Sequence, residues 1–132
     1  MRNEIPSPIS LQEKLTQVQA LWTPHRIAQF DGDQLVLARI QGEFVWHDHK
    51  EHDEVFLPIG GTLIMDLEES DGGSPKEVRV EPGQVIVVPK GMRHRPRTLE
   101  GQEVTLLVID PMDVKHTGDV QDAKTVDEYP EI

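Results

Sequence analysis

Residues 47–61 read HDHKEHDEVFLPIGG, and residues 83–94 read GQVIVVPKGMRH. Side chains of an extended strand point alternately to opposite faces, so His47 and His49 share one face. A carboxylate follows at Glu54, and the second stretch ends on a third imidazole. Imidazole nitrogens together with a carboxylate oxygen suit a divalent transition metal, and nothing else in the chain offers a comparable group of donors. The pattern therefore predicts a metal site with four ligands: His47, His49, Glu54 and His94.

The first stretch has a simpler interpretation as a solvated edge strand, because its histidines stand among charged residues. An HxH pattern alone would fit that interpretation. The complete set of four donors favours the metal site, since ligand type and strand period agree. His52 is assigned to a loop rather than to the ligand set. His52 is also the one acid–base group that this stretch places near the site, which makes it a weak catalytic candidate. The sequence assigns no other catalytic residue.

The composition limits the classes of function. The chain has 132 residues, 36% hydrophobic and 28% charged, which fits one globular domain with a single core. A formal net charge of −11 argues against nucleic acid or an anionic membrane as a partner. The absence of cysteine excludes disulfides and thiolate ligands. No apolar run approaches the roughly 20 residues of a membrane span, so we expect a cytoplasmic protein.

The order of sequence patterns predicts a mainly β protein with one short helix at the start. Ser10 and Glu13 have the spacing of a capping box, and apolar residues recur at helical spacing over residues 11–22. Asp31 and Gly32 separate two apolar runs and predict a hairpin. About nine short strands follow the helix, at 26–30, 34–40, 44–49, 54–59, 62–67, 77–80, 84–88, 93–98 and 103–109, which is typical of a sandwich or barrel.

These patterns divide the chain into three parts. Residues 1–24 form an N-terminal segment with the short helix, and residues 25–110 form the barrel. Residues 111–132 are polar and acidic with a few scattered apolar anchors. We expect this C-terminal tail to lie along the surface of the barrel or across a neighbouring subunit, with His116 in solvent.

The two stretches resemble the two motifs of the cupins, G-(x)5-H-x-H-(x)3,4-E-(x)6-G and G-(x)5-P-x-G-(x)2-H-(x)3-N. The first motif begins at Gly42, with four residues instead of five before His47, and ends at Gly61. The second has Thr98 in place of its final asparagine. Neither departure touches a ligand position. The resemblance covers about residues 25–110 and implies a conical antiparallel β-barrel of jelly-roll type, with the same four metal ligands.

Strand alternation and the ligand set suggest what surrounds the metal. Val45, Phe56 and Pro96 share faces with the predicted ligands and are expected to line a substrate pocket. Arg39 is a further candidate, for an anionic substrate, if its strand turns it inward; otherwise it is solvated. The ligand set accepts iron, manganese, zinc or nickel, and the sequence does not choose among these cofactors.

The expected function is that of a small metal-dependent enzyme acting on a small oxygen-containing metabolite. Iron would permit dioxygenase chemistry, whereas manganese, nickel or zinc would suit an isomerase or a lyase. The alternative is a non-catalytic metal-containing module that binds or senses a sugar or a similar small molecule. A structural barrel with a vestigial site is disfavoured by the intact ligand set. The resemblance also implies a homodimer.

Overall fold

The computed structural model describes residues 4–69, 73–113 and 115–132 and contains one short helix, α1 (Leu11–Leu15). Eight strands follow it: β1 (His25–Phe30), β2 (Asp33–Gln41), β3 (Glu54–Gly60), β4 (Leu63–Glu68), β5 (Lys76–Val80), β6 (Ile86–Val88), β7 (Arg93–Thr98) and β8 (Glu103–Pro111). The predicted mainly β fold is thus confirmed. The expected turn at Asp31 and Gly32 joins β1 to β2, and both residues have positive φ angles of 47° and 79°.

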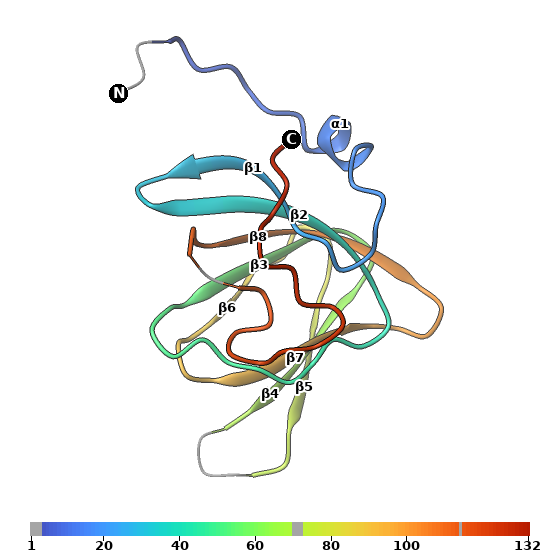
Figure 1. Cartoon of the computed structure of the whole chain (residues 1–132). Coiled ribbons are helices and arrows are strands. Elements are labelled where there is room, and N and C mark those ends of the chain that lie inside the picture. The colour runs from blue at the N-terminus through green and yellow to red at the C-terminus, as the bar shows by residue number, and fades with distance from the viewer. Residues whose placement is uncertain (1–3, 70–72, 114) are drawn as a thin grey trace.

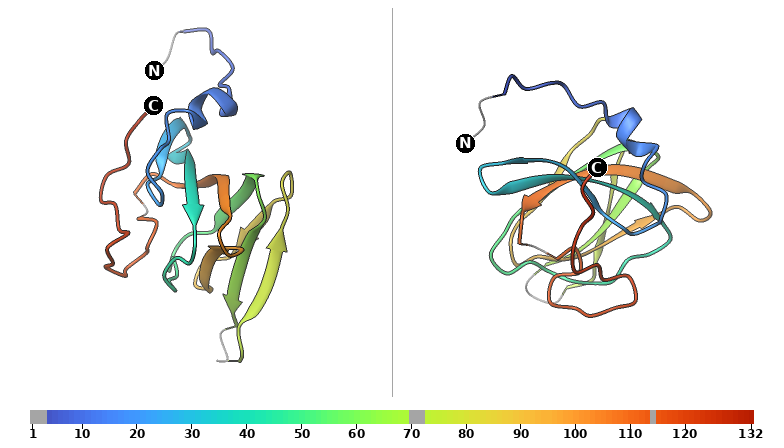
Figure 2. Two further views of the ribbon diagram at one scale, coloured as in Figure 1. Left: turned by 90° about the vertical axis from the view of Figure 1, so that its right-hand side faces the viewer. Right: turned by 45° about the horizontal axis from the view of Figure 1, so that its top comes forward.

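The strands form two antiparallel sheets. The larger has the order β1-β2-β8-β3-β6 and the smaller the order β5-β4-β7 (Figure 1). Several neighbours, such as β2 and β8, come from distant parts of the sequence, as in a jelly-roll. The two sheets face each other, and the C-terminal tail lies beside them as a separate layer (Figure 2, left). In the described part of the chain, no helix is long and apolar enough to cross a bilayer.

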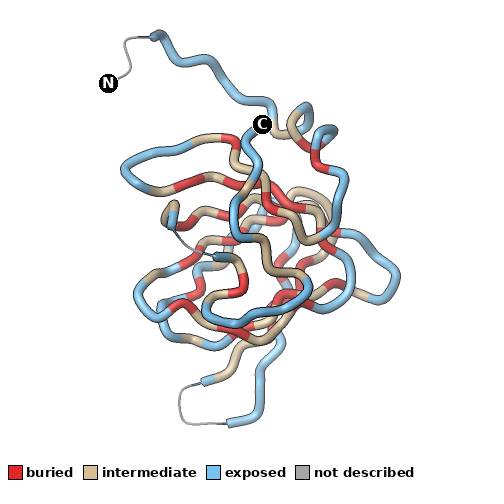
Figure 3. The backbone as a smooth tube through the Cα atoms, in the orientation of Figure 1, coloured by how far each residue is buried: buried red, intermediate tan, exposed pale blue. Residues whose placement is uncertain are grey.

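Alternation along β2 produces two cores. Val36, Ala38 and Ile40 face the barrel interior, where they pack with the inward residues of the other strands. Leu37 faces the outside of the sheet and is covered by α1 and the segment after it, in a second cluster with Leu15. Buried residues therefore lie on both faces of β2, whereas the N-terminal lead-in is exposed (Figure 3).

The helix is shorter than the predicted range 11–22, because it ends at Leu15 and the residues after Leu15 are not helical. The Thr16 hydroxyl donates a hydrogen bond to the Glu13 carbonyl, and Thr16 is the C-terminal cap. The following carbonyls find a different donor. The Arg39 guanidinium, on the outer face of β2, donates hydrogen bonds to the carbonyls of Leu15 and Val18. It thereby fastens the N-terminal segment to the sheet.

We expect Arg39→Met to loosen this segment. Methionine keeps most of the apolar stem but removes both hydrogen bonds to the carbonyls, which should cost about 1–2 kcal/mol of unfolding free energy. Urea denaturation measures the loss, and limited proteolysis should show new cleavage in residues 16–24. Glu103→Gln is the matched control. Glu103 contacts Arg39 only through an exposed ion pair of 2.8 Å, so this substitution should change the unfolding free energy by less than about 0.5 kcal/mol. Equal stability of Arg39→Met and the parent would contradict this role.

Candidate metal centre

The four predicted ligands come together from three parts of the fold. His47 and His94 stand directly opposite each other, because the backbone N–H of each donates a hydrogen bond to the carbonyl of the other, at 3.1 and 2.8 Å. His49 is held by its carbonyl, which accepts a hydrogen bond from the Gly91 N–H at 2.8 Å. Glu54 begins β3 and points into the barrel. Each ligand is therefore placed by backbone pairing rather than by its own side chain.

The donor atoms are close, buried and oriented toward a common centre. One ligand atom from each of the four side chains lies within 4.8 Å of the others, and among the described residues this is the one such group. The Nε2 atoms of His49 and His94 are each 3.3 Å from the Glu54 Oε1. None of these three atoms has a hydrogen bond, although all are buried. Buried polar atoms that converge without bonding to each other are what a metal ion requires.

Backbone contacts fix which imidazole nitrogen is free. The Nδ1 atoms of His47 and His94 each lie 2.9 Å from a carbonyl, of Val45 and Met92 respectively. A carbonyl only accepts, so Nδ1 carries the hydrogen in both rings and Nε2 keeps its lone pair for a metal. Burial, helped by the nearby His94, lowers the pKa of His47 to about 3, so that this ring stays neutral.

A second carboxyl group supports Glu54. Burial and the closeness of Glu54 raise the pKa of Asp110 to about 9, which favours a protonated carboxyl group beside Glu54. Gln34 fixes Asp110 in turn through a 2.9 Å hydrogen bond from its Nε2 to Oδ1. Burial alone would raise the pKa of Glu54, but the closeness of His49 and His94 holds it well below its usual range. Glu54 is thus an oriented carboxylate.

The cluster borders an apolar cavity inside the barrel. His47 and Glu54 belong to its wall, and the volume of the cavity is about 60 Å³. One water needs only about 10–15 Å³ by this measure, so a small organic molecule has room. Most of the wall is apolar and comes from inward residues of β2, β3 and β8: Val36, Ala38, Ile40, Phe56, Leu106 and Val108.

The predicted pocket residues divide into two groups. Phe56 and Pro96 line the cavity, as expected from alternation with Glu54 and His94. Val45 does not line it, because the chain before His47 is not a regular strand and Phe44 is turned inward instead. Arg39 lies on the outer face of β2 and has its contacts there. His52 is half-buried outside the ligand cluster, in a polar surface depression beside His49.

Three polar residues of the cavity were missed by sequence reasoning. Asp110 lies two residues after the inward-facing Val108 on β8 and faces the same side. Extending the alternation of this strand by two residues would therefore have predicted its inward position. His116 and Tyr129 come from the tail, which covers one side of the cavity instead of lying in solvent. The backbone of the tail end pairs with β1, where the Arg26 N–H donates to the Pro130 carbonyl at 2.8 Å. Such a placement depends on contacts between distant parts of the chain.

Gly118 lets the tail approach the ligand loop. Its φ is +62°, and a Cβ at this position would overlap the Asp48 carbonyl oxygen, between the two ligands of the HxH pattern. We expect Gly118→Ala to weaken the docking of the tail on the barrel by up to about 2 kcal/mol. Hydrogen exchange of the backbone amides over residues 115–129 should then become faster. Gly101→Ala is the matched control, because Gly101 has a φ of +72° with nothing near its Cβ position. Equal tail protection in the two variants would contradict this contact.

Comparison with known proteins identifies the class. The cupin domain family matches residues 35–110, more than half of the chain. This protein therefore belongs to the cupin domain family. The Uncharacterized protein YdbB of Bacillus subtilis (strain 168) is 35% identical over 62 residues, which cover 47% of this chain and 50% of that relative.

Two solved structures extend the comparison. The crystal structure of a cupin-2 domain containing protein from Shewanella frigidimarina NCIMB 400 has a TM-score of 0.70 and 31% identity, over 78% of this chain and 93% of that one. Hydroquinone 1,2-dioxygenase from Sphingomonas sp. TTNP3, with 4-hydroxybenzoate bound, has a TM-score of 0.67 and 20% identity, over 78% of this chain and 31% of that one. At that identity the likeness concerns the fold alone.

Proposed function

We propose that this protein is a metal-dependent enzyme whose substrate is a small oxygen-containing organic molecule, bound at the metal within the apolar cavity. The observation that carries this proposal is the continuity of cluster and cavity, since His47 and Glu54 belong to both. A ligand in the cavity would be in reach of the metal and largely removed from water. The small aromatic ligand bound by the Sphingomonas dioxygenase supports the view that this fold can enclose such molecules.

The residues of the chain divide the work at this site. His47, His49, Glu54 and His94 would hold a divalent ion, which supplies open coordination positions and acts as a Lewis acid or, if it is iron, as a redox centre. The apolar wall excludes water and strengthens electrostatic contacts inside. Asp110, whose pKa is raised by burial beside Glu54, would orient this carboxylate. The reaction type is therefore that of a dioxygenase, an isomerase or a lyase.

Reconstitution tests the proposal. Protein stripped of metal is loaded separately with Fe²⁺, Mn²⁺, Ni²⁺ or Zn²⁺ and mixed with neutral catechols, diketones and hydroxyketones. Oxygen consumption and mass spectrometry of the products follow the reaction. We expect turnover with at least one metal, and none with the same metal after His94→Ala. If the protein binds these compounds but converts none of them with any metal, the proposal that it is an enzyme is contradicted.

That contrary outcome would favour a non-catalytic binding module. The wall is mostly apolar, which suits simple binding as well as catalysis. A sugar is a poor candidate ligand, because an apolar wall leaves its many hydroxyls without partners. The homodimer and the cytoplasmic location expected from the sequence stay predictions; for the first, light scattering that gives the mass of one chain would contradict it.

A further inference from the structure

The C-terminal tail brings two buried polar atoms to the cavity that the protein itself leaves unused. These atoms are the Nδ1 of His116 and the hydroxyl oxygen of Tyr129, and neither has a hydrogen-bond partner. Both residues line the cavity that contains the metal ligands. A buried polar group without a partner costs free energy. Its presence in a cavity wall therefore indicates a ligand that forms the missing hydrogen bond.

Contacts hold the two side chains in place. The rings of His116 and Tyr129 stack with centroids 5.8 Å apart, and His116 packs against Phe44 at 5.1 Å. Phe44 in turn touches the ligand His47, with centroids 5.4 Å apart. The two tail residues are thus linked by packing to the metal cluster, and they face the same enclosed space.

The hydrogen-bonding character of His116 follows from its other nitrogen. Nε2 lies 2.7 Å from the Lys124 carbonyl, which can only accept, so Nε2 carries the hydrogen. Nδ1 is then an acceptor with a lone pair. The Tyr129 hydroxyl has a hydrogen to donate. An acceptor and a donor side by side match a hydroxyl group, which can do both at once.

The charges around the cavity narrow the ligand further. Among the described residues that line it, none is lysine or arginine, whereas Glu54 and Asp110 are both present. The distal part of a ligand therefore meets no cation that could balance a carboxylate or a phosphate. A neutral molecule avoids that cost.

We propose that His116 and Tyr129 form a hydroxyl-binding subsite, and that the substrate is a small, neutral, largely apolar molecule with one oxygen for the metal and a separate hydroxyl for the tail. This inference rests on the proposed function for its metal-bound oxygen. The tail thereby selects the substrate, because an analogue without the hydroxyl leaves buried polar groups unpaired.

Three matched probes test the subsite. Each is a catechol, which can chelate the metal, and they differ at one distal group: 4-(hydroxymethyl)catechol, 4-ethylcatechol and 3,4-dihydroxybenzoate. Calorimetry on the Zn²⁺-loaded protein measures binding without turnover, and metal content is checked after each titration. We expect the hydroxymethyl probe to bind about tenfold more tightly than the ethyl probe, as one good hydrogen bond predicts. The carboxylate probe should bind most weakly.

Tyr129→Phe is the informative variant because it removes one oxygen atom. It should abolish the preference for the hydroxymethyl probe without lowering the melting temperature, since that oxygen has no partner within the protein. His116→Phe, which keeps an aromatic ring against Phe44, should also remove the preference. Equal binding of the hydroxymethyl and ethyl probes by the parent, or an unchanged preference in Tyr129→Phe, would overturn the subsite and leave the proposed function intact. If none of the probes binds while zinc stays in place, the subsite is overturned, and the reconstitution with diketones and hydroxyketones decides on the proposed function separately.

Discussion

Protein carrying His94→Ala is expected to lose its metal. His94 is 1% exposed, and its Nε2 is one of the four converging donor atoms. Alanine leaves three donors, and the neighbouring imidazoles and carboxylate cannot move to replace the fourth because backbone pairing holds them. The affinity should fall by at least about 100-fold, the upper end of what loss of a mere supporting group costs. Elemental analysis should give close to one metal per parent chain and little in the variant.

A control histidine in the same stretch separates ligation from general effects. His52 lies between His49 and Glu54 in sequence, yet it is outside the cluster. His52→Ala should therefore keep its metal. Metal should also raise the melting temperature of the parent and of His52→Ala, because an ion that binds only the folded chain stabilises it. The proposed centre fails if His94→Ala retains a full complement of metal, or if the parent binds none after incubation with each of the four candidate ions.

The fold and the grouping of four donor side chains could be predicted because both depend on local patterns. Turn residues and strand alternation are properties of neighbouring positions, and His47, His49, Glu54 and His94 lie at fixed spacings within two short stretches. The motif position with threonine in place of asparagine is also explained. The Thr98 hydroxyl accepts a hydrogen bond from the Gly42 N–H at 2.9 Å, so it fastens the beginning of the first motif to the second.

The errors arose where alternation stops or where contacts are distant. Phe44 and His47 both point inward although three positions separate them, so the face of Val45 could not follow from a strict period of two. For Arg39 the sequence leaves an inward and a solvated position open, because the parity of β2 does not follow from its own strand. His116 was expected in solvent because the approach of Gly118 to the ligand loop, which brings the tail over the cavity, depends on residues about 70 positions apart.

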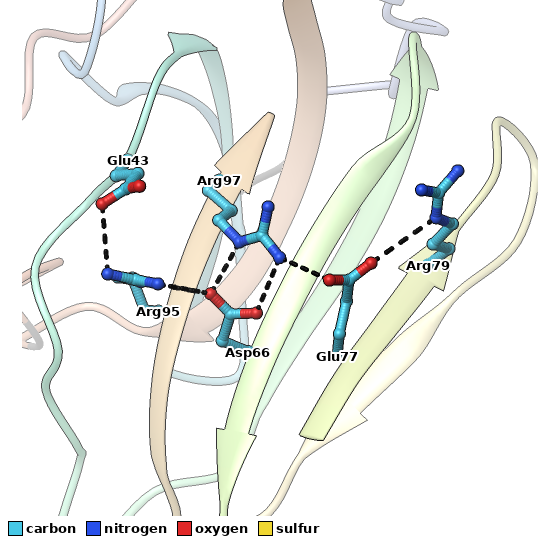
Figure 4. A network of polar contacts seen from close by, with 6 residues as sticks. All are labelled: Glu43, Asp66, Glu77, Arg79, Arg95 and Arg97. Atoms are coloured by element: carbon cyan, nitrogen blue, oxygen red, sulfur yellow. Dashed lines mark hydrogen bonds and ion pairs between the residues drawn. The ribbon is translucent and has the colours of Figure 1, made fainter. Parts of the chain in front are cut away.

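The outer face of the smaller sheet holds a chain of ion pairs centred on Asp66 (Figure 4). Asp66 accepts hydrogen bonds from Arg95 at 2.9 and 3.1 Å and from Arg97 at 2.7 and 3.1 Å. Glu43 extends the chain on one side and Glu77 on the other, where Glu77 also contacts Arg79 at 3.6 Å. The side chain of Asp66 is 8% exposed, whereas those of the two arginines are about a quarter exposed. Among the described residues, Asp66 is therefore the carboxylate that pairs with both of these partly desolvated cations.

We expect Asp66→Asn to destabilise the fold by about 2–3 kcal/mol, less than the loss of a fully buried pair because water still reaches the arginines. Urea denaturation at pH 7 measures this difference. Glu69→Gln is the control, because the exposed contact of Glu69 with Lys76 at 3.1 Å should contribute less than about 0.5 kcal/mol.

The pH dependence gives this prediction a second readout. Although burial acts to raise it, the pKa of Asp66 is held below its ordinary value by the hydrogen bonds from Arg97 and Arg95. A carboxyl group whose pKa is lower in the folded state stabilises the fold above the unfolded pKa, and this contribution is lost as the pH falls. The difference between the parent and Asp66→Asn should therefore be largest at neutral pH and narrow below about pH 4. Asparagine does not titrate, so any change of the difference with pH comes from the carboxylate of the parent. A difference in unfolding free energy that stays constant down to pH 3 would mean that the carboxylate charge contributes nothing and that shape explains the lower stability of Asp66→Asn.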